Sequence, residues 1–179
     1  DGEKSNAARA AKLLHAATSL NTDKPTQIAL LKTCVEYGFK TLPVEKARIT
    51  TETALDRLAD ITDPEAKDSF LTDKRIEFYR ICYRQYSKSK LAKLGTRSRL
   101  IAALCEGAQH AERTGNWTDA IKTHTEVVRL ATFPASPDLP SLRRKLKRAT
   151  HMRKVQQQID LSAKQLKADP DNARARTTL

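Results

Sequence analysis

The sequence predicts an all-α protein of antiparallel helix pairs, arranged as a short solenoid or an irregular bundle of about seven helices. Apolar residues recur at three- and four-residue spacing through most of the 179 residues. No segment has the alternation or the β-branched density of a strand. Short turns join successive helical segments, which makes consecutive helices antiparallel neighbours.

Proline-containing junctions mark several of the expected helix starts. Asp23 and Asp63 precede Pro25 and Pro64, so each aspartate is placed to cap a helix and each proline to occupy its first turn. Gly38 fits a C-cap. We expect a break at 93–96 and helices over about 3–20, 25–38, 42–60, 64–90, 97–114, 117–131 and 141–168.

The expected helix over 64–90 carries most of the aromatic side chains, and we expect it to form the central packing surface. Tyr79, Tyr83 and Tyr86 interleave with Arg80 and Arg84, an arrangement that can stack nucleic-acid bases. Their spacing of four and three residues places the rings on one helix face, which favours a place in the core.

The sharpest pattern lies in residues 101–134. It consists of a large residue, small residues, a turn glycine, an aromatic residue, another small residue and a valine, at Leu104, Ala108, Ala111, Gly115, Trp117, Ala120 and Val127. These spacings resemble the tetratricopeptide repeat. The resemblance implies a helix hairpin in which the alanines allow close crossing and Gly115 takes a positive φ. His124 departs from the pattern, because a bulky hydrophobe usually stands there.

A second resemblance covers most of the chain. Residues 12–17 (KLLHAA), 27–32 (QIALLK), 142–147 (LRRKLK) and 166–172 (LKADPDN) occur in an order that resembles the helical regions of large exported proteins of planctomycete-type bacteria. That likeness implies a non-enzymatic fragment of a larger protein, in the periplasm or cell envelope. We expect hairpin repeats over 1–134, a proline-rich connector at 135–140, a long basic helix over 141–168 on the same domain, and a truncated next repeat at 169–179.

The positive charge is concentrated in two segments. The net charge is +12, and the segments 74–99 and 139–168 each contain nine Lys or Arg and one acidic residue. A basic helix attracts polyanions such as nucleic acid, anionic lipid or sulfated polysaccharide. The alternative is a solvated face, or one that pairs with acidic segments elsewhere. The candidate binding residues are Arg143, Arg144, Lys147, Arg148, Arg153 and Lys154.

The residues that could carry catalysis or bind a metal follow no known spacing. Cys34, Cys82 and Cys105 are far apart in sequence and lie among apolar residues, so we expect buried thiols; one disulfide with one free thiol is the alternative. We expect no metal, no cofactor, no transmembrane segment and no enzymatic activity. The predicted function is a scaffold that binds a protein or peptide, including other domains of the same polypeptide, with polyanion binding as the alternative.

Overall fold

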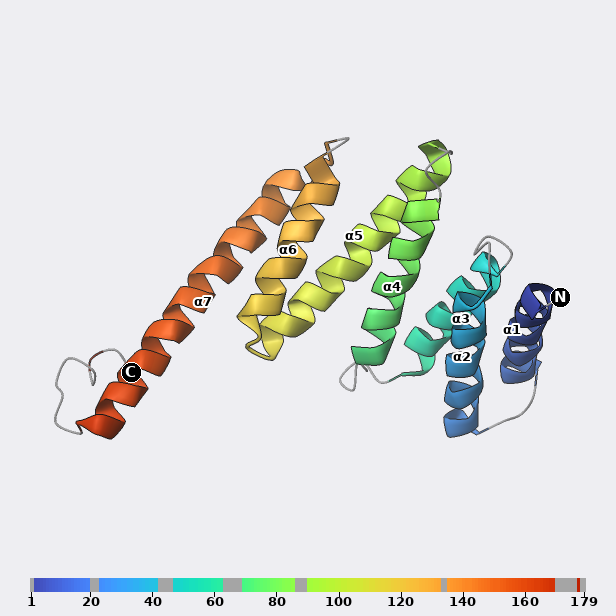
Figure 1. The fold of residues 1–179 in the computed structure, drawn as a ribbon, viewed down its shortest axis with the longest axis horizontal. Coiled ribbons are helices and arrows are strands. Elements are labelled where there is room, and N and C mark those ends of the chain that lie inside the picture. Colours follow the sequence, from blue (N-terminus) through green and yellow to red (C-terminus); the bar gives the residue numbers. More distant parts are fainter. Residues whose placement is uncertain are drawn as a thin grey trace. The chain divides into compact units, whose positions relative to one another are not determined.

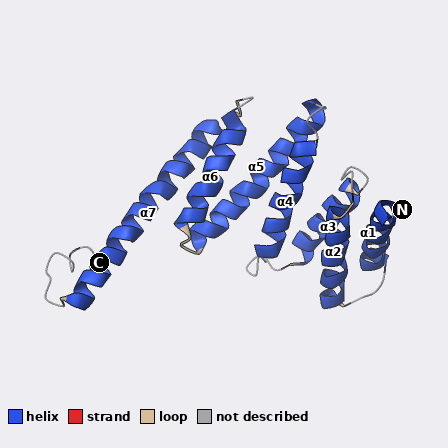
Figure 2. Cartoon of the chain, in the orientation of Figure 1, coloured by secondary structure: helices blue, strands red, loops and turns tan. Residues whose placement is uncertain are grey.

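The computed structural model describes residues 2–19, 23–41, 47–62, 69–85, 90–132 and 135–169, together with Thr177. All regular secondary structure in these residues is helical (Figure 2), which confirms the all-α prediction. The seven helices (Figure 1) are α1 (Gly2–Ser19), α2 (Lys24–Phe39), α3 (Arg48–Ile61), α4 (Ser69–Gln85), α5 (Lys90–Arg113), α6 (Trp117–Thr132) and α7 (Leu139–Ala168).

The chain forms two compact units, residues 1–103 and 104–179, and the division falls within α5. In the first unit, α2 packs against both α1 and α3. The predicted start of α2 is confirmed, because the Asp23 side chain accepts a hydrogen bond from the Thr26 backbone N–H and Pro25 lies in the first turn. Phe78 of α4 is completely buried and makes edge-to-face contacts with Phe39 and Tyr79.

Gly38 has a different role from the predicted C-cap. It lies inside α2, which ends at Phe39 with Lys40 as its C-cap residue. A Cβ atom at Gly38 would lie 2.0 Å from Oγ1 of Thr51 on α3. Glycine is therefore required here because two helices approach closely, and its conformational freedom is not used.

The predicted break at 93–96 is wrong, because α5 continues from Lys90 through Gly95 to Arg113. A glycine in a helix costs roughly 1 kcal/mol relative to alanine, and tertiary contacts can outweigh that cost. Gly95 itself is exposed, but its neighbours along α5 make such contacts: the Lys93 ammonium lies over the Tyr83 ring of α4, and Thr96 and Leu100 are buried.

The second unit contains the end of α5 together with α6 and α7. Ala111, Ala120 and Ala149, one from each helix, form a buried cluster that Trp117 and Ile121 cover. Gly115, in the turn between α5 and α6, has φ of 72° as predicted. Leu104, Ala108 and Val127 are also buried. These burials describe a tightly packed hairpin, and the repeat assignment stays a prediction.

Several expected features lie outside the described residues. They include the helix start at 42–43, the Asp63–Pro64 junction, Tyr86, and the next repeat at 169–179 apart from Asp169 and Thr177. Of the expected connector at 135–140, the last two residues belong to α7, which begins at Leu139. Pro140 lies in the first turn of that helix.

Candidate interaction surface

Helix α7 packs through one stripe in its N-terminal half and leaves the opposite side of that half exposed. Leu142 and Ala149 are buried, and α7 lies beside α6 (Figure 1). At 100° per residue, these two positions fall within about 20° of each other around the helix axis. From Arg143 to Lys154, the residues about 180° away from them are exposed, whereas Ser162, further along on that same side, is buried. Helix α6 has 16 residues and lies beside only part of the 30-residue α7. Helix α7 extends beyond the N-terminal end of α6 (Figure 1).

Five of the six predicted binding residues lie on this outward side. Their helical positions span an arc of about 140° centred opposite Leu142 and Ala149. All five side chains are exposed, and none has an ion pair with another residue in the described part of the chain. We define the basic face of α7 as Arg143, Arg144, Lys147, Arg148 and Lys154.

Arg153 does not belong to the basic face. It follows buried Ala149 by four residues, which places it on the side of α7 that carries the packing stripe. Its side chain is exposed nonetheless. His151 follows Arg148 by three residues and is also exposed, so the imidazole lies among the arginines. The spacing in the sequence already indicated this position.

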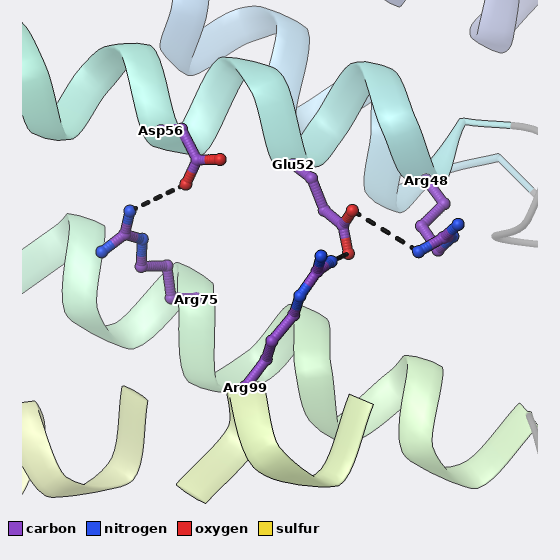
Figure 3. Close-up of polar contacts among 5 residues, drawn as sticks. All are labelled: Arg48, Glu52, Asp56, Arg75 and Arg99. Atoms are coloured by element: carbon purple, nitrogen blue, oxygen red, sulfur yellow. Dashed lines mark hydrogen bonds and ion pairs between the residues drawn. The ribbon is translucent and has the colours of Figure 1, made fainter. Parts of the chain in front are cut away.

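The other basic segment, 74–99, has partners within the fold. Figure 3 shows Arg75 of α4 and Arg99 of α5 pointing toward two carboxylates of α3. Arg75 Nη2 donates to Asp56 Oδ1 at 3.0 Å, and Arg99 Nη1 donates to Glu52 Oε1. The Arg99–Glu52 hydrogen bond raises the pKa of the Arg99 guanidinium. Arg48 approaches the other oxygen of Glu52 at 3.5 Å.

Other cations of this segment are also engaged. Lys74 pairs with Glu77 at 2.9 Å, and Arg97 is buried with 8% of its surface exposed. Tyr79 is buried, which confirms its predicted place in the core. Burial raises the pKa of Tyr79, and the nearby negative charge of Glu52 raises it further by a smaller amount. In the α4–α5 segment, Arg75 and Arg99 therefore tie their helices to α3, whereas the basic face of α7 has no such ion pair in the described part of the chain.

The three cysteines are free thiols, so the disulfide alternative does not hold. Cys34 and Cys82 are buried, as predicted, and Cys105 is partly buried. Burial raises the pKa of Cys34 to about 11; burial, together with the charge of Glu52, raises the pKa of Cys82 to about 12. Burial also raises the pKa of Cys105. Thiols with raised pKa values are poor nucleophiles at neutral pH, because the thiolate is the reactive form.

His124 is almost completely buried, with 1% of its surface exposed, and its Nε2 lies 2.7 Å from Oε1 of Glu112. An ionised carboxylate only accepts hydrogen bonds, so Nε2 carries the hydrogen in this pair. Nδ1 is buried without a hydrogen-bond partner in the described part of the chain. The histidine thus fills a core position and links α5 to α6.

Among the described residues, no three His, Cys, Asp or Glu side chains gather closely enough to hold a metal ion. No described helix has both the length and the apolar character needed to cross a bilayer.

Comparisons with protein-family models, with curated proteins and with solved structures found no match for this chain.

Proposed function

We propose that the chain is a non-enzymatic, helical-repeat-type interaction module whose second unit presents the basic face of α7 to an acidic macromolecule. One observation supports this proposal above the others. The two basic segments carry the same net charge in the sequence. Arg75 of α4 and Arg99 of α5 pair with carboxylates of α3, whereas the basic face of α7 is exposed and has no ion pair in the described part of the chain.

The electrostatics of the basic face favour a binding role. Residues 143–154 span eleven residue steps, or about 16 Å at 1.5 Å per residue. Five cations within that length repel one another, since the Debye length in physiological salt is about 8 Å. A polyanion that lies along the face relieves this repulsion and attracts the protein from a distance.

The remaining chemistry of the chain supports binding over catalysis. The buried thiols of Cys34 and Cys82 stay protonated at neutral pH. His124 is buried and paired with Glu112. The α5–α6 hairpin then serves as the scaffold against which α7 packs.

Heparin-affinity chromatography tests the proposal. The triple variant R143E/R144E/R148E lowers the net charge from +12 to +6, since 12 − 3 × 2 = 6. A control variant, K12E/K24E/R57E, makes the same net change at three exposed positions of the first unit. We expect the α7 variant to lose retention above 0.15 M salt, on the order of physiological ionic strength, and the control to elute close to the unmodified protein. Equal losses in the two variants would show that only net charge matters and would overturn the proposal.

A further inference from the structure

We propose that the acidic partner of α7 is double-stranded nucleic acid, contacted through its phosphate backbone. This inference rests on the proposed function, because it names the partner of the same basic face. Three features carry it: the residue types that are exposed along α7, the residue types that are missing from it, and the length of the charged face.

From Arg143 to Lys154, the exposed residues of α7 are charged or polar, and none is apolar. Every exposed residue from Arg143 to Lys154 is Arg, Lys, His or Thr. Protein–protein interfaces usually depend on a buried apolar or aromatic centre, and a helix that lies in a membrane interface needs an apolar face. Leu142 and Ala149 are buried in the second unit and are not available for either purpose. A phosphate backbone needs only cations and hydrogen-bond donors.

The composition of α7 also favours a duplex over a single strand. Proteins that hold single strands combine a basic groove with aromatic side chains on which the bases stack. Residues 139–168 contain no Phe, Tyr or Trp. Of the two exposed leucines in the described chain, only Leu161 lies on α7, seven residues beyond Lys154. The helix can therefore approach a duplex that keeps its bases stacked inside.

The basic face is long enough for all five of its cations to lie against phosphates of one duplex. Double-stranded DNA carries one negative charge per about 1.7 Å of axis, so a 16 Å stretch presents about ten phosphates on its two strands. No acidic residue occurs from Leu139 to Ile159, so no carboxylate opposes them. Three of the five cations are arginines, whose planar guanidinium groups bind phosphate oxygens in a bidentate manner. Binding of this kind depends on the backbone and shows no sequence preference.

The test measures fluorescence anisotropy with labelled 24-base-pair DNA and RNA duplexes of random sequence. A matching single strand, polyglutamate, heparin and phosphatidylserine vesicles serve as competitors. With five phosphate contacts, the slope of log K against log salt should be about −4 to −5. We expect R144Q/R148Q to weaken duplex binding at least tenfold and to reduce the slope by about 2. The control K12Q/K24Q should remain within about twofold, and changing the base sequence should alter affinity less than about twofold.

The outcomes separate this inference from the proposed function. Duplex competition that depends on Arg144 and Arg148, and that exceeds competition by the single strand, supports the inference. If heparin retention depends on α7 but the duplexes do not bind, or if polyglutamate, vesicles or the single strand compete better, the nucleic-acid assignment is overturned and the proposed function stands. If heparin retention does not depend on α7, both fail. RNA and DNA duplexes share the phosphate chemistry, and the two labelled arms show which is preferred.

Discussion

Nε2 of His124 on α6 lies 2.7 Å from Oε1 of Glu112 on α5, and the imidazole is buried between the two helices. Glu112 keeps 22% of its side chain exposed, so its second oxygen reaches water. The pair therefore places a polar link at a buried position between α5 and α6.

Removing either partner of this pair should have unequal effects. E112A leaves Nε2 buried without its acceptor, which should cost about 1–3 kcal/mol in the free energy of unfolding. H124L replaces the ring with an apolar side chain of similar size, and Glu112 then turns to solvent, so it should cost less than E112A. Urea unfolding followed by circular dichroism measures both. A larger loss in H124L than in E112A would contradict this assignment of roles.

Two glycines within helices should respond to alanine in opposite directions. At Gly38 the new methyl group would meet Oγ1 of Thr51, and overpacking of this kind should cost about 1–3 kcal/mol. At Gly95 a Cβ atom meets nothing within 4 Å, so G95A should stabilise the protein by up to about 1 kcal/mol. Thermal melts of the two variants compare them directly. If the new methyl group at position 38 destabilises the protein by meeting Oγ1 of Thr51, then T51A should restore much of the stability that G38A loses.

The two acidic residues of α3 should differ in importance. Glu52 holds both Arg48 and Arg99 and has 16% of its side chain exposed, whereas Asp56 holds Arg75 and has 69% exposed. We expect D56A to cost less than about 0.5 kcal/mol and E52A about 1 kcal/mol or more. The difference between the stability losses of E52A and D56A should become smaller in 0.5 M salt, where the Debye length falls to roughly 4 Å. Equal losses at low salt would argue against a central position of Glu52.

The buried thiols should make stability fall at high pH. Folding raises the pKa of Cys34 to about 11 and of Cys82 to about 12 from an ordinary value of 9.0. The unfolded chain therefore releases these protons first, and the stabilisation present below pH 9 is lost as the pH rises toward 11–12. The melting temperature of the unmodified protein should decline more steeply between pH 9 and 11 than that of C34A/C82A. Parallel slopes would contradict the burial argument.

The sequence was sufficient to predict helices whose start and packing depend on near neighbours. Asp23 and Pro25 start α2 within one turn, and Gly115 reverses the chain between α5 and α6. Residues whose role depends on side chains distant in the sequence were harder to predict. Gly38 resembled a cap because the close approach of Thr51, thirteen residues further along, is a tertiary contact. Gly95 resembled a break because the contacts of its neighbours with α4 are not visible in the pattern.

The candidate surface also depends on tertiary contacts that the local sequence does not reveal. The segments 74–99 and 139–168 carry equal charge in the sequence, and nothing local separates them. The structure separates them because Arg75 and Arg99 meet Asp56 and Glu52, which lie 19 and 47 residues away. On α7, the helical period alone placed most of the basic residues on one side. Arg153 was included among them by sequence proximity, although its position follows the packing stripe.

We propose that α7, and not the equally basic α4–α5 segment, is the binding surface. Amide chemical-shift mapping of the isotope-labelled protein, titrated with an unlabelled duplex, distinguishes the two segments residue by residue. We expect the shifted amides to concentrate between Arg143 and Lys154, the amides of α1–α3 to stay in place, and the shifts to disappear in R143E/R144E/R148E. Shifts that concentrate between Lys74 and Arg99, or that spread evenly over both segments, would contradict it.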